Sequence, residues 1–283
     1  MSGPRPAEGA FGALPALNTS ELGRNLLLLS EVDSTNRYLK DNGGELPHGT
    51  VCCTDRQTAG KGRRGREWNV PPGRSLALSV LFKPAVLPRQ EGEASLLPLL
   101  CGLAAARALD RLTSSGPVPF GIKWPNDIVC SGAKLGGILC ESRLDRSGGY
   151  TVAGIGINLC QTREDFQRLG LDHATSLALC RPAAPSPAQT AAAFIEDLEP
   201  LWQTWRREGF GPLREEFARR CVTLGQEVRV YASLSEAGEP PLLEGTAVGI
   251  DDAGRLCVRG AADNSITAVS AGEVSVRGLY GYS

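Results

Sequence analysis

The sequence predicts an α+β fold, in which a central mixed or antiparallel sheet with helices is followed by a small β-barrel. Short apolar runs suited to strands recur through the first 160 residues, with helical patterns between them. Two further helical patterns follow at 186–208 and 211–220. From about residue 223 the chain changes to short strands separated by turns. This order is typical of an α+β domain followed by a small all-β domain.

The elements of the first domain follow from apolar runs and helix caps. Ser34-Thr35-Asn36 offers caps for a short helix that ends at Gly43-Gly44, and the apolar face of 92–112 predicts a longer helix. Residues 55–74 lack periodicity and predict a loop, and loops of that length are usually functional or disordered. Strands are predicted at Leu26–Ser30, Thr50–Thr54, Leu76–Phe82, Phe120–Lys123, Ile128–Cys130, Leu135–Ser142 and Tyr150–Leu159.

The C-terminal part shows five short strand patterns, and Asp252-Ala253-Gly254 supplies a hairpin turn between two of them. We therefore expect a flexible leader rich in Gly, Pro and Ala over residues 1–22, an α+β domain over 23–222 and a β-barrel over 223–283. The predicted strands of the barrel are 226–232, 242–250, 255–259, 265–269 and 273–277.

Composition excludes several classes of protein. The 283 residues carry 30 basic and 31 acidic side chains, and a net charge of −1 disfavours binding of nucleic acid or anionic membrane by the whole surface. The nine cysteines and the two histidines, His48 and His173, show no metal-ligand spacing, which disfavours a structural metal site. The cysteine count is odd and the cysteines are scattered, which indicates a reducing, cytoplasmic location. The longest apolar stretch is broken by Pro98 and Arg107, so no membrane span is predicted.

The segment from Gly60 to Trp68 combines glycines with cations. Glycines 60, 62 and 65 formally spell G-x-G-x-x-G, but Pro71 and Pro72 block the helix that a dinucleotide fold would need, and no Walker motif is present. A mobile backbone that wraps an anion remains, with Trp68 able to stack on a ring. A merely solvated basic loop or an arginine-rich nucleic-acid patch is the alternative, and the three glycines and Trp68 disfavour it. The cations are Lys61, Arg63, Arg64 and Arg66.

Two further motifs gather polar groups beside apolar strands. Lys123-Trp124-Pro125-Asn126-Asp127 forms a corner that collects a cation, an amide, a carboxylate and an indole. Lys134 precedes Gly136-Gly137, and Gly154–Asn158 repeats the pattern of strand glycines with one polar side chain. Glycines inside a strand allow a ligand or backbone to approach closely. A simple turn between strands and a solvated surface lysine are the structural alternatives.

These residues resemble the biotin protein ligases, also called biotin–[acetyl-CoA-carboxylase] ligases, from about residue 26 to 278. The resemblance implies a class II synthetase-like catalytic domain over 23–222 and an SH3-like barrel over 223–283. It also implies a reaction in which ATP activates biotin as biotinoyl-5′-AMP and a lysine of a biotin carboxyl carrier protein then attacks it. The matching motifs are Ser34-Thr35-Asn36, Gln57 with Gly60–Trp68, Lys123–Asp127, Lys134–Leu139, Gly154–Asn158 and Gly272–Arg277.

The resemblance also implies roles for individual residues, with Lys134, Arg63 and Arg66 as the catalytic group. Mg²⁺ would be carried mainly by ATP, near Asp127. The family often has Arg where this chain has Lys61, which would weaken a bidentate contact at that position. The implied biotin-binding residues are Ser34, Thr35, Asn36, Gln57, Lys61, Gly62, Arg63 and Lys134. The implied nucleotide-binding residues are Arg63, Arg66, Trp68, Asn126, Asp127, Lys134, Asn158, Glu273 and Arg277.

Two alternative functions stay open at this point. A lipoate–protein ligase would use the same activation chemistry, although the hydroxyls and amides of Ser34, Thr35, Asn36 and Gln57 favour the ureido ring of biotin. A DNA-binding repressor would need an N-terminal helix-turn-helix, and the 33 residues before Ser34 show no such pattern. We therefore expect a carrier domain of acetyl-CoA carboxylase or a related carboxylase as partner, with no specific DNA and no membrane. The sequence leaves monomer and homodimer open.

Overall fold

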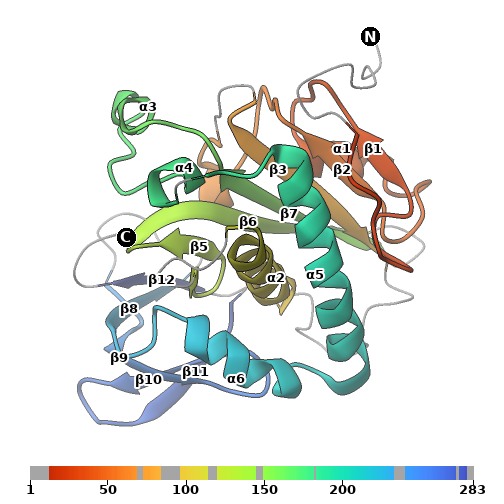
Figure 1. Ribbon diagram of the computed structural model, residues 1–283. Helices are drawn as coiled ribbons and strands as arrows, with labels where there is room; N and C mark the ends of the chain where they lie inside the picture. Colours follow the sequence, from red (N-terminus) through yellow and green to blue (C-terminus); the bar gives the residue numbers. More distant parts are fainter. Residues whose placement is uncertain are drawn as a thin grey trace.

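The structure is a computed structural model (Figure 1). It describes residues 13–68, 73–83, 96–113, 120–144, 149–181, 183–232, 240–271 and 274–278, without the side chains of Arg64 and of 274–278. The first domain contains β1 Leu26–Leu28, α1 Thr35–Asn42, β2 Val51–Thr54, a 3₁₀ turn Arg63–Gly65, β3 Ser75–Phe82, α2 Leu97–Leu112, β4 Gly121–Lys123, β5 Asp127–Cys130, β6 Ala133–Arg143, β7 Tyr150–Asn158, α3 Arg163–Arg168, α4 Leu177–Cys180, α5 Pro187–Glu208 and α6 Gly211–Arg220. The C-terminal β domain contains β8 Glu227–Ala232, β9 Leu243–Ile250, β10 Leu256–Gly260, β11 Ile266–Val269 and β12 Val274–Gly278.

The first domain is built on a seven-stranded mixed sheet with strand order β1-β2-β3-β7-β6-β5-β4. Only the β1–β2 pair is parallel, and the other neighbouring strands in this sheet are antiparallel. The C-terminal β domain is an antiparallel sheet of order β11-β10-β9-β8-β12. The predicted α+β fold class is therefore confirmed.

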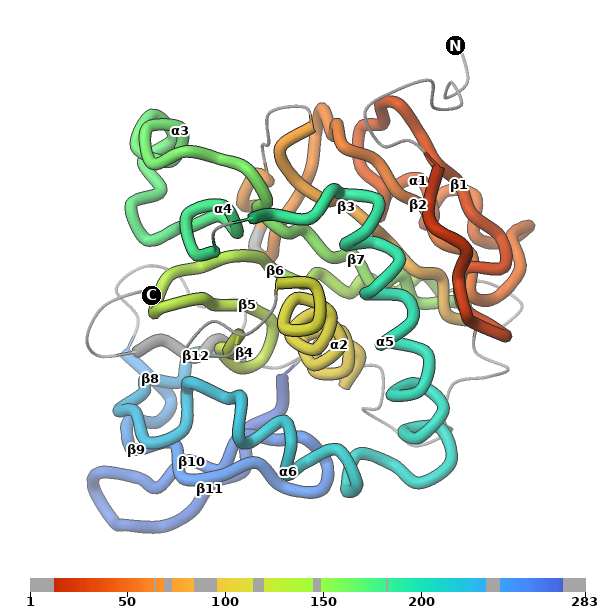
Figure 2. The backbone as a smooth tube through the Cα atoms, viewed as in Figure 1, coloured from red at the N-terminus to blue at the C-terminus, as the bar shows by residue number. Residues whose placement is uncertain are grey.

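Helices cover both faces of the large sheet, so its central strands are buried on both sides. Helices α2 and α5 lie together on one face (Figures 1 and 2), where Trp202, Trp205 and Phe194 join the main hydrophobic core. A smaller core on the opposite face contains Leu39 of α1 and Leu81 of β3. Every residue of β3 is buried, as expected of a strand between two helical layers.

Capping side chains fix where the key helices begin. Ser34 accepts a hydrogen bond from the backbone N–H of Arg37 and starts α1, as predicted. Ser186 and Gln189 form a reciprocal capping box at the start of α5. The first cap matters for function because it sets Thr35 and Asn36 in the first turn of α1.

The C-terminal β domain packs against the predicted corner of the first domain. The indole N–H of Trp124, which is 1% exposed, donates a 3.2 Å hydrogen bond to the carbonyl oxygen of Gly254 in the β9–β10 turn. The backbone N–H of Trp124 donates to the hydroxyl of Thr223 at 2.9 Å. The corner is thus held from behind by the segment that opens the second domain and by one of its turns.

The structure differs from the predictions at three places. The helix predicted over 92–112 begins at Leu97, and its first predicted turn lies partly outside the described residues. Helices α3 and α4 were not predicted, because each is at most six residues long and shows no full apolar period.

The last residues of the predicted leader are held against α5. The carboxylate of Glu199 accepts hydrogen bonds from the backbone N–H groups of Ser20, Glu21 and Leu22 at 2.6 to 2.9 Å. These bonds hold the pKa of Glu199 below its usual value against the opposing effect of burial. Sequence patterns do not reveal such a contact, because its partners are 177 to 179 residues apart.

Candidate active site

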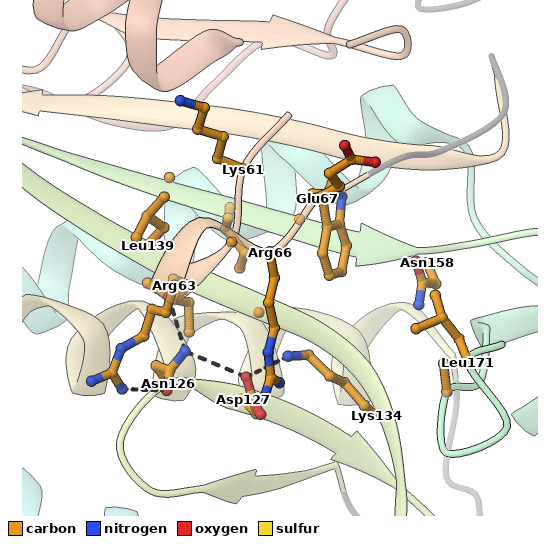
Figure 3. Close-up of a pocket in the computed structure, with 18 of the residues that line it drawn as sticks. Lys61, Arg63, Arg66, Glu67, Asn126, Asp127, Lys134, Leu139, Asn158 and Leu171 are labelled. Carbon is orange, nitrogen blue, oxygen red and sulfur yellow. Dashed lines mark hydrogen bonds and ion pairs between the residues drawn. The ribbon is translucent and has the colours of Figure 1, made fainter. Parts of the chain in front are cut away.

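A cavity of about 830 Å³ opens on the first domain, and most of the motifs singled out in the sequence converge on it. Its walls come from the start of α1, the loop 57–68, strands β5 to β7 and the segment 165–174. In Figure 3, Arg63 and Asn126 lie on one side, Asp127 and Lys134 in the middle, and Asn158 and Leu171 on the other side. The site is therefore an elongated depression over the sheet.

One end of the cavity is a network of neutral polar groups. The side-chain oxygen of Gln57 accepts hydrogen bonds from the backbone N–H of Thr35 at 2.9 Å and from its hydroxyl at 3.2 Å. The hydroxyl of Ser79 in β3 lies 2.7 Å from both the Thr35 hydroxyl and the Asn36 amide oxygen. Ser79 was not predicted as a site residue, since its strand reads as uniformly buried.

The amide of Asn36 is held on several sides. Its nitrogen donates to the carbonyl oxygen of Leu139 at 3.0 Å and to the carboxylate of Glu141 at 2.9 Å, while its oxygen lies beside Ser79. Burial alone would raise the pKa of Glu141, but hydrogen bonds from Lys40 and Asn36 and the charges of Lys40 and Lys61 hold it below its usual value. Glu141 is thus a fixed acceptor that orients Asn36.

Two strand glycines make room for these side chains, as the sequence predicted for close approach. A Cβ atom on Gly154 would lie 2.0 Å from the amide oxygen of Asn36. A Cβ atom on Gly156 would lie 2.5 to 2.7 Å from the indole of Trp68, which covers β7 at that point. Any larger residue would displace either side chain from the sheet surface.

A chain of charged and amide groups occupies the middle of the cavity. Arg63 donates to the side-chain oxygen of Asn126 at 2.9 Å, and the amide nitrogen of Asn126 lies 3.4 Å from an oxygen of Asp127. The same oxygen of Asp127 pairs with the ammonium of Lys134 at 2.8 Å (Figure 3). Asn126 itself is fixed to the carbonyl oxygen of Ile138 at 3.1 Å. The segment from Gly60 to Trp68 is thereby tied to the corner Lys123–Asp127 and to β6.

The middle of the cavity carries an excess of positive charge. Burial lowers the pKa of Lys123, and the nearby charges of Lys134 and Arg66 lower it further against the attraction of Asp127. Burial and the same three cations also lower the pKa of His173. Cations that disfavour one another's protonation form a site prepared for an anion. Neither Lys123 nor His173 was among the predicted site residues, although Lys123 belongs to the corner motif.

The far end of the cavity offers a ring platform and apolar walls. Trp68 is partly buried on Gly156, and its indole nitrogen is buried with no hydrogen-bond partner among the described residues. Asn158 donates to the carbonyl oxygen of Thr175 at 3.0 Å and accepts from Gln161 at 3.1 Å. Leu169 and Leu171 are 49% and 37% exposed at the cavity wall. Exposed leucines and an indole next to amides suit a planar heterocycle.

The structure brings most of the predicted site residues together around one cavity. Lys61 lines the cavity, but Figure 3 shows its side chain pointing away from the group around Asp127. Glu273 lies outside the described residues, and Arg277 is described only by its backbone pairing with Arg229 in β8. Those that line the cavity are Ser34, Thr35, Asn36, Gln57, Lys61, Gly62, Arg63, Arg66, Trp68, Asn126, Asp127, Lys134 and Asn158.

The side chains of the cavity suit a metal ion only if the bound small molecule carries the ion with it. Across the described ranges, no group of three or more His, Cys, Asp or Glu side chains is placed to hold a metal. The Asp127 carboxylate nevertheless lies in the middle of the cavity. Mg²⁺ is commonly bound by one or two carboxylates together with phosphates and water. One carboxylate among cations therefore fits Mg²⁺ that arrives on a triphosphate.

Comparisons with known proteins agree with this geometry. Residues 28–158 match the biotin/lipoate A/B protein ligase family, and residues 223–277 match the biotin protein ligase C-terminal domain. The biotin–[acetyl-CoA-carboxylase] ligase of Mycobacterium tuberculosis is 33% identical over 253 residues, covering 89% of this chain and 88% of that protein. None of the helices in the described parts is long and apolar enough to span a membrane.

Two solved structures of related proteins contain bound ligands. The biotin protein ligase of Aquifex aeolicus in complex with biotin and ATP superposes with a TM-score of 0.73 at 28% identity, covering 90% of this chain and 99% of that one. The ligase of Leishmania major in complex with biotinyl-5-AMP gives a TM-score of 0.56 at 28% identity, covering 88% and 99%.

Proposed function

The chain belongs to the biotin protein ligase family, and from this premise we propose that it activates biotin with ATP as biotinoyl-5′-AMP and transfers the biotinoyl group to a lysine of a carboxylase carrier domain. One observation carries the proposal. A neutral polar pocket, a cationic centre and a ring platform line a single cavity. This is the order of the ureido ring, the carboxylate with the α-phosphate, and the adenine in the adenylate.

Biotin enters with its ureido ring against the network of Thr35, Asn36 and Gln57. A hydrogen-bonding site of this kind rejects a ligand without matching groups, because its own buried polar groups would stay unpaired. The dithiolane ring of lipoate has no such groups. The hydroxyl of Ser34, at the start of α1, completes the polar wall.

Adenylation needs no nucleophilic side chain, because the carboxylate of biotin attacks the α-phosphorus and pyrophosphate leaves. The protein has to bring two anions together and stabilise the charge that develops. We assign to Lys134 the contact with the carboxylate and the α-phosphate, and to Arg63 and Arg66 the neutralisation of phosphate oxygens from the loop side, because all three line the cavity. Trp68 and Asn158 hold the adenine end.

Transfer follows when the amine of the carrier lysine attacks the carbonyl carbon of the adenylate and AMP leaves. The mixed anhydride reacts readily with water, so its lifetime depends on how well the loop 60–68 covers it. Arg63 fastens this loop to Asn126 of the corner. We assign the loop the role of retaining the adenylate until the carrier arrives.

Mg²⁺ is part of the proposal as the ion that accompanies ATP, where it neutralises charge on the phosphates and the departing pyrophosphate. Asp127 is the side chain that we place nearest to it, either directly or through water. The domain limits are proposed as 23–222 for the catalytic unit and 223–283 for the β domain. The family matches and the two separate sheets support them.

The proposal is tested by exchange of labelled pyrophosphate into ATP, measured side by side with biotin and with lipoate. We expect exchange that depends on biotin and is absent with lipoate. Exchange supported by lipoate alone would establish the alternative ligase, and exchange with neither acid would reject the adenylation chemistry.

Replacement of Arg63 by alanine is expected to shorten the lifetime of the bound adenylate by about tenfold, the scale of one lost charge-assisted hydrogen bond. The rate of its formation should change less. Release of radiolabelled biotinoyl-AMP after rapid gel filtration measures that lifetime. Arg56→Ala is the matched control, since Arg56 precedes the loop and pairs with Glu31. An unchanged release rate in Arg63→Ala would contradict the retaining role of the loop.

The affinity for ATP is expected to fall as the pH rises through the pKa of Lys123. That pKa lies below the ordinary lysine value in the free protein, and a bound polyphosphate favours the protonated form. ATP binding should therefore weaken at a lower pH than an unperturbed lysine would give. Titration calorimetry from pH 7 to 10 measures this fall in ATP affinity, and Lys123→Arg should shift the fall to higher pH. If the affinity falls over the same pH range in both proteins, another titrating group is responsible.

A further inference from the structure

Two cysteines that the proposed reaction does not use lie next to each other behind the nucleotide end of the cavity. Cys130 ends β5 and is buried, and Cys180 ends α4 and is partly exposed. The two thiols interact, and each is the main cause of the shift in the pKa of the other. The guanidinium of Arg181 donates to the sulfur of Cys130 at 3.8 Å and to the carbonyl oxygen of Cys180 at 3.0 Å.

The surroundings favour a thiolate at Cys180. The hydrogen bond from Cys130 lowers the pKa of Cys180 to about 6, aided by a hydrogen bond from Thr175 and by the charges of Arg181 and Arg163, against the effect of burial. The same hydrogen bond, together with burial, raises the pKa of Cys130. A thiolate beside a protonated thiol is the arrangement of an attacking and a resolving cysteine.

Other cysteines of the chain contrast with this pair. Burial raises the pKa of Cys52 and Cys101 to about 12, and it also raises the pKa of Cys53 and Cys140. Thiols that stay protonated inside a core react slowly with oxidants and alkylating agents. The pair at 130 and 180 is therefore distinguished by its polar partners and by the access that Cys180 has to solvent.

Thr175 connects the pair to the proposed site. Its hydroxyl lies 3.4 Å from the sulfur of Cys180. Its backbone N–H donates to the carbonyl oxygen of Lys134 at 2.8 Å, and its own carbonyl oxygen accepts from Asn158 at 3.0 Å. One residue thus contacts the reactive sulfur, the backbone of the catalytic lysine and a side chain at the adenine end.

We propose that Cys180 and Cys130 form a modification site for hydrogen peroxide, and that its oxidation slows adenylation through Thr175. The Cys180 thiolate attacks the peroxide oxygen, the O–O bond breaks, and the hydroxide that leaves takes up a proton to become water. The Cys130 thiol then attacks the sulfenic sulfur of Cys180, a disulfide forms, and a second water is released. Two thiols are oxidised and one peroxide is reduced. The effect on activity rests on the proposed function, whereas the thiol chemistry does not.

Thiol reactivity is tested first on the reduced full-length protein, with iodoacetamide and mass spectrometry. We expect Cys180 to be alkylated faster than the exposed Cys160 at pH 6.5, with a midpoint near pH 6. Cys130→Ala should move that midpoint upward, because the donated hydrogen bond is lost. If Cys180 of the wild-type protein is labelled no faster than Cys160, the proposed reactivity of Cys180 is wrong.

Hydrogen peroxide then tests the modification and its consequence. We expect a Cys130–Cys180 disulfide in the wild type, and a dimedone-trapped sulfenic acid at Cys180 in Cys130→Ala. Biotin-dependent pyrophosphate exchange should fall by about tenfold or more, the scale of small displacements of reacting groups, and dithiothreitol should restore it. Cys180→Ala should resist this loss, while Cys160→Ala should not. Absence of the disulfide would overturn the site, and a disulfide with unchanged exchange would overturn its link through Thr175. No exchange in the reduced protein would instead reject the proposed function and leave the thiol result standing.

Discussion

Replacement of Lys134 by alanine is expected to lower biotin-dependent pyrophosphate exchange by about 10³-fold, as removal of one fixed charge at a developing anion does. The ammonium lies in the middle of the cavity, 2.8 Å from the carboxylate of Asp127. Its removal also leaves the Asp127 carboxylate to repel the incoming phosphates. The fold should be unchanged, because the backbone of residue 134 keeps its hydrogen bonds to His173 and Thr175.

Steady-state exchange and thermal unfolding of the same preparation separate these two effects. Lys134→Arg should recover part of the activity, since the charge is kept but its position changes. Lys83→Ala is a matched control, because Lys83 also makes defined contacts, to the carbonyl oxygens of Gly43 and Gly44, at a distance from the cavity lining. Pyrophosphate exchange at the wild-type rate in Lys134→Ala would show that Lys134 is an ordinary surface lysine without a role in adenylation.

Replacement of Gly154 by alanine is expected to weaken biotin binding by about 10- to 100-fold, the range for a buried hydrogen-bonding group left without its partner. The new methyl group would lie 2.0 Å from the amide oxygen of Asn36. Asn36 cannot yield easily, because its amide is fixed by Leu139, Glu141 and Ser79. The polar wall of the biotin end would therefore be rearranged.

Titration calorimetry with biotin alone measures this loss without any need for turnover. Gly249→Ala is the control, because a methyl group there meets nothing within 4 Å. In the double variant with Asn36→Ala, the glycine substitution should cost little more than Asn36→Ala alone, since its target is gone. Additive losses in the two variants would show that Gly154 acts through something other than Asn36.

The sequence carried enough information to predict the candidate site because its chemistry sits in short local motifs. The Gly60–Trp68 segment and the Lys123–Asp127 corner are each continuous, and their residue types indicate anion binding without knowledge of the fold. Ser79 could not be found in this way. It lies in a strand whose every residue is buried, so only the packing of β3 against α1 shows that its hydroxyl meets Thr35 and Asn36.

Long-range pairing accounts for the contacts that the sequence did not reveal. Trp68 lies on Gly156 because the loop folds back over β7, and no local pattern records that contact. Glu141 and Asn36 are 105 residues apart, and the role of one depends on the other. The absence of specific DNA binding, the cytoplasmic location and the oligomeric state stay predictions.

Lys61 is a departure from the family pattern, and we expect it to be tolerated because of its position in the loop. Its backbone pairs with Glu67 across the loop, and its side chain is exposed and turned away from the cationic centre. A residue that contributes through its backbone can be lysine or arginine with little difference. The bidentate role is left to Arg63, whose guanidinium contacts Asn126.

The hydrogen bond from Trp124 to Gly254 bears on how a shortened chain would be interpreted. A chain ending at residue 222 would lack the acceptor of this buried indole, and an orphaned donor of that kind costs about 1 to 3 kcal/mol. Trp124 stands two residues before Asn126, so the damage would spread into the catalytic corner. Such a fragment could fail while keeping every side chain assigned to catalysis between residues 34 and 158. Its inactivity would then show that the corner at Trp124 needs support from the C-terminal β domain, and would not show that this domain touches biotin or ATP.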